Sequence, residues 1–212
     1  MNRPHHALRG VYAITDERLT PGAQLVERVS AVLRGGARVI QYRDKSADCG
    51  RRRDEARQLK DLCEAHGALL LINDDVELAR AVGAHGAHIG QEDEGLAEAR
   101  ALLGKRAVIG VTCHDSLTLA LAAEDGGADY VAFGAVFTSP TKPQARRAPL
   151  ALITEARRRL RVPICAIGGI EADNAAQVVA AGADMLAVIS GVFAQADPEA
   201  TTRRIQALFT RD

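Results

Sequence analysis

Several short apolar stretches of this 212-residue chain end in polar side chains that could do chemistry. In the clearest case four bulky apolar residues at 69–72 are followed at once by Asn73, Asp74 and Asp75. An apolar run too short for a helix is typical of a strand buried on both faces. Acidic residues at the end of such a strand can belong to an enzyme site at the mouth of a barrel or sheet, or can cap the next helix. The stretch alone leaves both interpretations open.

A second polar stretch follows the apolar start of the segment at 39–45. In it Gln41, Arg43 and Lys45 alternate with other residues. Alternate residues of a strand share one face, so these three side chains would point the same way. The pattern predicts either a solvent-exposed edge or a pocket that binds an anion.

Asp93 lies at the polar end of the segment at 87–93, one strand further along than Asp74. Two carboxylates at the ends of neighbouring strands suit Mg²⁺, which takes one or two carboxylates and completes its shell with water and phosphate oxygens. The sequence has no His/Cys cluster with the spacing of a zinc site. The alternative is that both acids only cap helices.

Glycines and hydroxyl residues mark the last strand ends. Gly168-Gly169 and Ser190-Gly191 expose backbone amides at the positions where barrels often bind phosphate. A tight turn is the other explanation of the glycine pair. The long polar loop at 137–149 adds hydroxyl groups and a cation that could close over a substrate, namely Ser139, Thr141 and Lys142.

Two histidines accompany these motifs. His114, which follows Thr112 at a strand end, could act as an acid or base, or could be a hydrogen-bonded structural residue. His88 lies within a strand and is interpreted as structural. The chain contains neither a Ser/His/Asp nucleophile elbow nor a P-loop motif.

The elements that must position these side chains alternate regularly between strand and helix. Five Gly-Ala pairs, at 36–37, 67–68, 86–87, 127–128 and 182–183, join an expected helix to an expected strand. The expected strands with their polar ends cover 10–16, 39–45, 69–75, 87–93, 107–114, 130–136, 162–169 and 185–190.

Eight such units of about 26 residues, with right-handed crossovers, predict an α/β fold of the (β/α)8 TIM-barrel type. An open doubly wound sheet is the second choice, because no GxGxxG turn follows the first strand. In a barrel all the polar strand ends would converge at one rim.

Composition narrows the class of protein. The chain is 47% hydrophobic and 3% aromatic, and 27 Lys and Arg balance 27 Asp and Glu, so no long-range field points to nucleic acid or an anionic membrane. We expect a flexible tail at 1–9 and one catalytic domain at 10–212. The four cysteines lack CxxC spacing and no stretch resembles a signal peptide or membrane span, which predicts a cytoplasmic protein with reduced thiols.

Taken together, the motifs resemble those of the thiamine phosphate synthase family from about Gly10 to the C-terminus. The motifs that carry this resemblance occur in the family's order: Gln41-x-Arg43-x-Lys45, Ile72-Asn73-Asp74-Asp75, His88-Ile89-Gly90-Gln91-Glu92-Asp93, Ser139-x-Thr141-Lys142, Ile167-Gly168-Gly169-Ile170 and Ile189-Ser190. The resemblance implies a (β/α)8 barrel that joins hydroxymethylpyrimidine diphosphate to hydroxyethylthiazole phosphate, forming thiamine phosphate and pyrophosphate.

The resemblance also implies roles for individual residues. Asp74 and Asp93 would bind Mg²⁺. Ligands of the pyrimidine diphosphate and its leaving group would be Gln41, Arg43, Lys45, Asn73, Thr112 and Lys142, of which Arg43, Lys45, Lys142 and Thr112 are the expected catalytic residues. Ser139 and Thr141 would lie near the thiazole phosphate, and its phosphate would meet Gly169, Ile189 and Ser190. Thr112 and Ser139 exchange hydroxyl residues relative to the commonest family pattern, and both keep the hydroxyl group.

Two other functions are compatible with parts of this pattern. A thiazole tautomerase-like isomerase of the same barrel family would use His114 and leave Asp93 idle. A non-catalytic phosphate-ligand binder would release no pyrophosphate. In every case the expected partners are small molecules rather than nucleic acid or membrane, and homo-oligomer formation is left open.

Overall fold

Eight parallel strands close into a barrel in the order of the sequence, from β1 to β8 and back to β1. The computed structural model describes residues 8–90, 95–138 and 147–209. The strands are β1 (Gly10–Ile14), β2 (Val39–Tyr42), β3 (Leu69–Asn73), β4 (Gly86–Ile89), β5 (Val108–His114), β6 (Tyr130–Gly134), β7 (Ile164–Ile167) and β8 (Met185–Val188). The predicted TIM barrel is confirmed, and the open sheet is excluded because β1 pairs with both β2 and β8.

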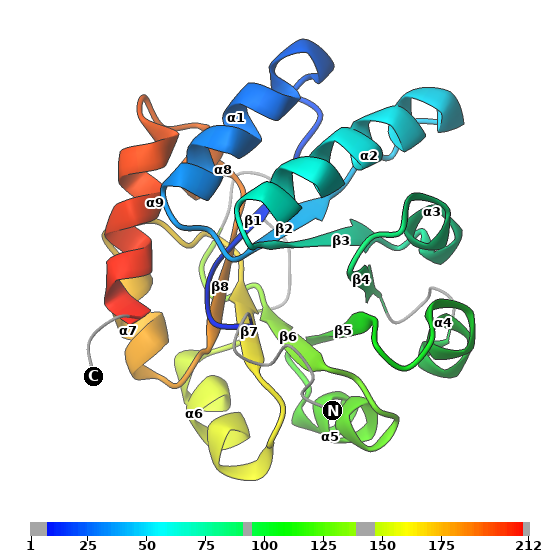
Figure 1. Ribbon diagram of the computed structural model, residues 1–212. Coiled ribbons are helices and arrows are strands. Elements are labelled where there is room, and N and C mark those ends of the chain that lie inside the picture. Colours follow the sequence, from blue (N-terminus) through cyan, green and yellow to red (C-terminus); the bar gives the residue numbers. More distant parts are fainter. Residues whose placement is uncertain (1–7, 91–94, 139–146, 210–212) are drawn as a thin grey trace.

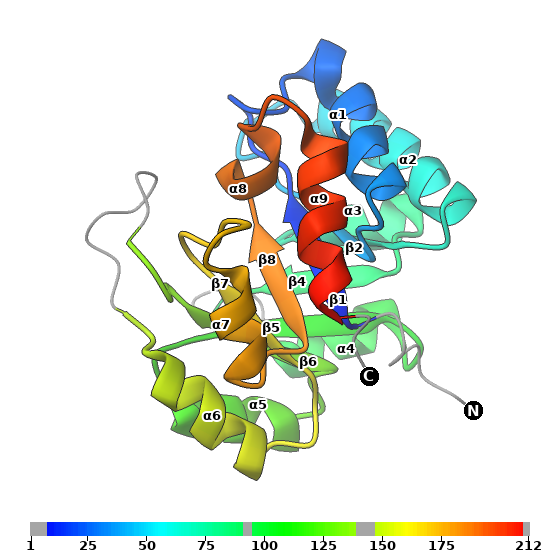
Figure 2. The same ribbon diagram turned by 90° about the vertical axis from the view of Figure 1, so that its left-hand side faces the viewer.

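Helices surround the barrel, as Figure 1 shows in a view in which the strands occupy the centre of the molecule. They are α1 (Gly22–Arg34), α2 (Cys49–Ala65), α3 (Val76–Val82), α4 (Leu96–Leu103), α5 (Leu117–Asp125), α6 (Leu150–Arg159), α7 (Ala175–Ala180), α8 (Ser190–Phe193) and α9 (Pro198–Gln206), followed by a 3-10 turn at Ala207–Phe209. The C-terminal α9 packs beside α1, which Figures 1 and 2 both show, and the Arg34–Glu199 ion pair of 2.7 Å joins the two helices.

The strands carry two separate hydrophobic cores because successive side chains point to opposite faces. On β1, Val11 and Ala13 belong to the outer core between strands and helices, whereas Tyr12 and Ile14 belong to the core inside the barrel. The stretch Leu69–Ile72 divides in the same way and is buried throughout. The interpretation of that stretch as a strand buried on both faces is therefore correct.

The glycines that end the helices follow the expected pattern in four of the five cases. Gly36, Gly67, Gly127 and Gly182 have φ angles between 64° and 109°, a region that costs glycine little. The fifth prediction is wrong, because the left-handed cap of α3 is Gly83 and not Gly86. Gly86 is already in β4, where a Cβ atom would overlap the carbonyl group of Val108 on the next strand.

Some element boundaries differ from the expected ones. β2 ends at Tyr42 and β8 at Val188, so several polar residues expected within strands lie in the loops that follow. The sequence pattern did not reveal α8, a single turn that begins at Ser190. Leu8 is 2% exposed and belongs to the core inside the barrel, whereas residues 1–7 of the predicted tail lie outside the described residues. Among the described helices, none combines the length and apolar character needed to cross a membrane.

Candidate active site

A cavity of about 600 Å³ lies at the carboxyl end of the barrel, where the polar ends of the strands converge. It brings together nine of the predicted site residues: Gln41, Arg43, Lys45, Asn73, Asp74, Thr112, Gly169, Ile189 and Ser190. They come from β2, β3, β5, the loops after β2, β3, β7 and β8, and the first residue of α8. Residues up to 149 positions apart in sequence thus share one space because every parallel strand points its carboxyl end to the same rim.

The cations after β2 are held by contacts of their backbone. The amide of Arg43 donates to Thr15 Oγ1 at 2.8 Å, and the amide of Lys45 donates to a carboxylate oxygen of Glu17 at 2.8 Å. Both partners belong to the loop after β1. Gln41 is buried within β2, whereas Arg43 and Lys45 lie beyond its end. All three nevertheless line the cavity, and the binding of an anion by these side chains stays a prediction.

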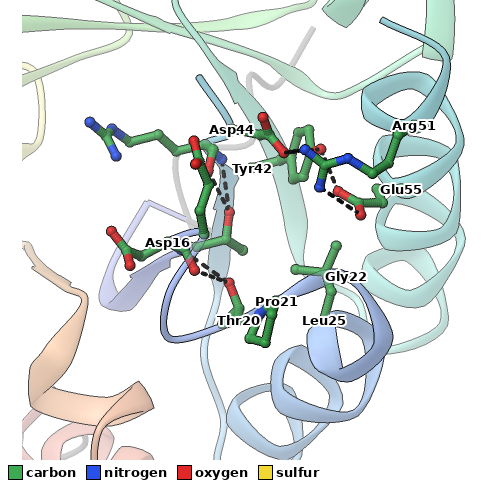
Figure 3. Close-up of a pocket in the computed structure, with 12 residues that line it drawn as sticks. Asp16, Thr20, Pro21, Gly22, Leu25, Tyr42, Asp44, Arg51 and Glu55 are labelled. Carbon is green, nitrogen blue, oxygen red and sulfur yellow. Dashed lines mark hydrogen bonds and ion pairs between the residues drawn. The ribbon is translucent and has the colours of Figure 1, made fainter. Parts of the chain in front are cut away.

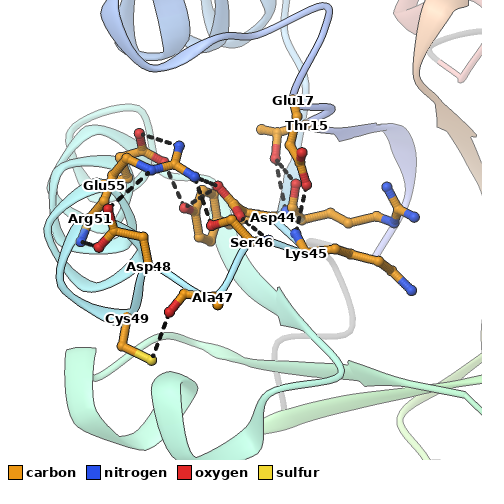
Figure 4. A network of polar contacts seen from close by, with 12 residues as sticks. Thr15, Glu17, Asp44, Lys45, Ser46, Ala47, Asp48, Cys49, Arg51 and Glu55 are labelled. Atoms are coloured by element: carbon orange, nitrogen blue, oxygen red, sulfur yellow. Dashed lines mark hydrogen bonds and ion pairs between the residues drawn. The ribbon is translucent and has the colours of Figure 1, made fainter.

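The residues between these cavity-lining side chains are anchored on the opposite side by α2. The Tyr42 hydroxyl donates to Glu55 at 2.6 Å, and Arg51 pairs with Asp44 at 2.7 Å and Glu55 at 3.3 Å. Figure 4 shows Asp44 directed toward Arg51 while Lys45 extends away from α2. Alternate residues are therefore fixed to the scaffold, and the remaining ones are presented to the cavity.

A smaller pocket of about 220 Å³ separates this anchor from the loop after β1 (Figure 3). Asp16 and Thr20 lie on one side of it, and Tyr42, Asp44 and Glu55 on the other. Burial acts to raise the pKa of Asp44, but hydrogen bonds from Ser46 and the charges of Arg51 and Arg52 outweigh it, so this pKa is lowered. The carboxylate therefore stays ionised and keeps its partner on α2.

The acidic pair after β3 divides into two roles. Asp75 caps α3: its carboxylate accepts from the amide of Leu78 at 2.8 Å and pairs with Arg52 at 2.7 Å. For Asp75 the helix-cap interpretation of this stretch is thus confirmed. Asp74 lines the cavity instead and has a φ of 62°, which is uncommon for a residue with a side chain. Asn73 donates to its carboxylate at 2.5 Å.

The donor set around Asp74 suits a hard cation as far as the structure describes it. Carboxylate oxygen is the preferred protein ligand of Mg²⁺, and one or two carboxylates suffice when phosphate and water complete the shell. Within residues 8–90, 95–138 and 147–209 no group of three or more His, Cys, Asp or Glu residues could hold a metal ion. The predicted second ligand, Asp93, lies outside those residues, as do Ser139, Thr141 and Lys142 of the long loop.

The glycines after β7 let two chain segments approach each other. Gly168 and Gly169 have φ values of 108° and 59°, and a Cβ atom on Gly169 would come within 2.5 Å of the Thr138 carbonyl oxygen. Glycine is therefore needed here for the backbone conformation and the close approach, and its role in phosphate binding stays a prediction. The same two residues line the cavity together with Ile189, Ser190 and Gly191, so the bare backbone also faces the space where a phosphate was expected.

Both histidines line the cavity, in different settings. His114 is exposed at the end of β5 and has a φ of 50°. His88 is half-buried, with Nδ1 2.8 Å from the hydroxyl of Tyr130 and Nε2 2.8 Å from that of Thr112. The interpretation of His88 as a structural residue agrees with these contacts.

Two tyrosines beneath the polar rim were missed by the sequence reasoning. Tyr12 lines the cavity, and its hydroxyl lies 2.9 Å from that of Tyr130 and accepts from Gln41 Nε2 at 2.5 Å. The period-two pattern of β1 places Tyr12 on the inner face together with Ile14 and could have identified it. Tyr130 is the first residue of β6, and no local signal shows which residues it reaches.

One family model, two relatives and one solved structure that are similar to this chain carry related descriptions. The family model described as thiamine monophosphate synthase matches residues 11–192. The thiamine-phosphate synthase of Thioalkalivibrio sulfidiphilus is 64% identical over 209 residues, covering 99% of each chain, and that of Halorhodospira halophila is 51% identical, covering 100% of this chain and 99% of its own. The solved structure of thiamine phosphate pyrophosphorylase from Pyrococcus furiosus is 35% identical, with a TM-score of 0.88 and 98% of both chains covered.

Proposed function

The chain belongs to the thiamine monophosphate synthase family, and we propose that the cavity at the carboxyl end of its barrel is where its reaction takes place. The enzyme is a transferase, a thiamine-phosphate synthase. It joins 4-amino-2-methyl-5-hydroxymethylpyrimidine diphosphate to hydroxyethylthiazole phosphate. One observation supports this location above the others: nine residues expected to bind the two substrates and the metal line the same cavity.

The proposed reaction is a substitution at the methylene carbon of the pyrimidine substrate. The bond from this carbon to the diphosphate oxygen breaks, and pyrophosphate leaves with the electron pair. The electron-rich aminopyrimidine stabilises the methylene cation that remains. The lone pair of the thiazole nitrogen then forms the new carbon–nitrogen bond, so no proton has to be transferred.

Arg43 and Lys45, with Lys142 from the long loop, would stabilise the negative charge that develops on the departing pyrophosphate. Fixed cations in a partly closed site lower the energy of such a transition state because they need no reorganisation during the reaction. The anchoring of Tyr42 and Asp44 on α2 supports this role, since it directs Arg43 and Lys45 to the cavity. Gln41, Asn73 and Thr112 would bind and orient the same substrate.

The second substrate would bind on the opposite side of the cavity. We assign its phosphate to the backbone at Gly169, Ile189 and Ser190, and its thiazole end to Ser139 and Thr141. Holding both reactants in one geometry can contribute about 7–11 kcal/mol to lowering a barrier. The proposed mechanism relies on this positioning and on electrostatics, and it requires no covalent enzyme intermediate.

Asp74 and Asp93 are the residues we assign to Mg²⁺. The ion, when bound, would neutralise charge on the diphosphate. The αL conformation of Asp74 supports the assignment, because strained residues occur at functional sites more often than elsewhere. Asn73 would orient the carboxylate through its 2.5 Å hydrogen bond.

The proposed partners are the two small-molecule substrates. The proposed location is the cytoplasm, which agrees with four cysteines that are all free thiols, three of them buried. Burial raises the pKa of the Cys63 thiol to about 12, and that of the Cys113 thiol to about 12, so both stay protonated and unreactive.

One assay tests the proposed function against its two alternatives. Both substrates are mixed with the full-length protein and Mg²⁺, and thiamine phosphate and pyrophosphate are measured. Equal amounts of the two products are expected. An isomerase would change the thiazole phosphate without releasing pyrophosphate, and a binding protein would bind it without any product. In the same assay, near-normal turnover of Asp93→Ala at saturating Mg²⁺ would overturn the metal assignment.

A further inference from the structure

Five polar side chains form a continuous chain of hydrogen bonds through the interior of the barrel. Gln41 Nε2 lies 2.5 Å from the Tyr12 hydroxyl, which lies 2.9 Å from the Tyr130 hydroxyl. The Tyr130 hydroxyl lies 2.8 Å from His88 Nδ1, and His88 Nε2 lies 2.8 Å from Thr112 Oγ1. We call Gln41, Tyr12, Tyr130, His88 and Thr112 the relay. Its two ends are expected substrate ligands, and the three residues between them have no role in the mechanism proposed above.

The relay exists because β5 lacks a side chain where the chain of contacts crosses it. Gly110 pairs with His88 on one side and with Tyr130 on the other. A Cβ atom on Gly110 would overlap the ring of Tyr130. Without that atom the Tyr130 ring stacks on the His88 ring, with centroids 5.6 Å apart and an interplanar angle of 25°. Residues from β4 and β6 therefore meet across an intervening strand.

Each tyrosine in the relay has one proton to donate. Burial raises the pKa of Tyr12 and that of Tyr130 well above the usual range, so both hydroxyls remain protonated at neutral pH. Tyr12 accepts from the amide of Gln41. Its own proton then has one acceptor among the described residues, the hydroxyl of Tyr130.

This first bond determines the direction of all the others. Tyr130 accepts from Tyr12 and must therefore donate to Nδ1 of His88, which has to be unprotonated. A neutral imidazole then carries its proton on Nε2 and donates to Thr112 Oγ1. In the reverse direction the Tyr12 proton would be buried without a partner, which is unfavourable because a buried donor that has left water is then unpaired.

We propose that Tyr12, Tyr130 and His88 are positioning residues that transmit the orientation of the Gln41 amide to the hydroxyl of Thr112. The relay makes Thr112 an acceptor toward His88 and directs its own proton away from His88, as a hydrogen-bond donor. Before substrate arrives, the Gln41 amide is thus held as a hydrogen-bond donor to the relay, and the Thr112 hydroxyl is held as an acceptor from it. The direction of the relay does not depend on the proposed function, whereas the expected effect of the relay on substrate binding rests on it.

The tautomer of His88 is the direct test, because it reports the direction of the relay without any substrate. The ¹⁵N NMR spectrum of the full-length protein labelled at histidine is recorded near pH 8, and His88 is assigned by its loss in His88→Gln. We expect a neutral ring protonated at Nε2. A ring protonated at Nδ1, or at both nitrogens, would overturn the proposal.

Variants at the far end of the relay test transmission. Gln41→Glu replaces the donor with an acceptor and is expected to move the His88 proton from Nε2 to Nδ1. Tyr12→Phe disconnects Gln41 and is expected to give a mixture of the two tautomers. Tyr42→Phe, which removes a tyrosine hydroxyl outside the relay, should leave the tautomer unchanged. A shift in either relay variant supports the proposal, and an unchanged tautomer in both contradicts it.

Kinetics then separate a positioning role from a merely structural one. Tyr130→Phe keeps the ring and removes two relay bonds, so we expect the KM for the pyrimidine diphosphate to rise about tenfold, equivalent to roughly 1.4 kcal/mol. The KM for the thiazole phosphate should change less than about twofold. Equal changes in both would contradict a role directed at one substrate. Failure of the unmodified protein to form thiamine phosphate would overturn the proposed function and leave the tautomer result intact.

Discussion

The guanidinium of Arg51 on α2 lies 2.7 Å from the carboxylate of Asp44, whose side chain is 4% exposed. Asp44 separates Arg43 from Lys45, and both of these cations line the large cavity. An ion pair on the outside of the barrel thus holds Asp44, the residue that lies between two expected substrate ligands. The pair is a structural support for the site rather than part of its lining.

Arg51→Met should weaken binding of the pyrimidine diphosphate, because it releases Asp44 and loosens the segment that carries Arg43 and Lys45. We expect its KM to rise about threefold to tenfold, which corresponds to the net free energy of about one ordinary hydrogen bond, because the Arg51 side chain is partly exposed. Arg53→Met is the matched control, since Arg53 is an exposed cation of the same helix without an ion pair to a described residue. An equal effect in the control would mean that charge alone, and not anchoring, explains the result.

The neighbouring acids Asp74 and Asp75 should respond differently to substitution. Asp74→Asn is expected to reduce turnover and the affinity for Mn²⁺, used as a probe ion, by on the order of a hundredfold, because it removes a metal ligand. Asp75→Ala should keep both while lowering the free energy of unfolding by about 1 kcal/mol through loss of the α3 cap. Metal binding is measured by titration and stability by urea unfolding. Unchanged Mn²⁺ affinity in Asp74→Asn would refute the assignment.

Two Gly-Ala-Asp repeats at the opposite end of the barrel differ in burial. Asp129 accepts from the amide of Ile109 and pairs with Arg100 at 2.6 Å, and its side chain is 5% exposed. Asp184 accepts from Ile164 and pairs with Arg157 at 2.7 Å, and its side chain is 31% exposed.

Asp129→Ala should therefore destabilise the protein more than Asp184→Ala. Removing one partner of a buried ion pair costs about 3–5 kcal/mol, whereas exposed pairs contribute about 0–1 kcal/mol. Urea unfolding of both variants measures the difference. Equal losses would mean that burial does not decide the strength of these contacts.

His85 should make stability depend on pH. Its Nδ1 accepts from the amide of Leu70 at 3.0 Å, and burial lowers its pKa. Because the folded-state pKa lies below the unfolded value of about 6.5, the stabilisation is complete above that pH and is lost as the pH falls toward the folded-state pKa. The slope of unfolding free energy against pH just below 6.5 should thus decrease in His85→Asn. The exposed His66 provides the control, and His66→Asn should keep the slope.

The barrel itself could be predicted from the sequence because its signals are local. Apolar runs of strand length, helical spacing and glycine at helix ends each depend on a few neighbouring residues, and eight repeats of the unit leave few ways to pack. The carboxyl ends of parallel strands must then meet. That is why Gln41, Asp74 and Ser190 could be assigned to one site from sequence alone.

Other features depended on contacts between distant segments, which local patterns do not encode. The Gly-Ala pattern took Gly86 as a helix-ending glycine, but Gly86 lies in β4, where its missing side chain makes room for the carbonyl group of Val108 on the next strand. The sequence also could not reveal that Tyr12 and Tyr130, 118 positions apart, share a hydrogen bond. That bond requires barrel closure, the strand register and the missing side chain of Gly110 together. The sequence alone determined which side chains reach the rim, whereas the tertiary structure decided how the residues beneath them are connected.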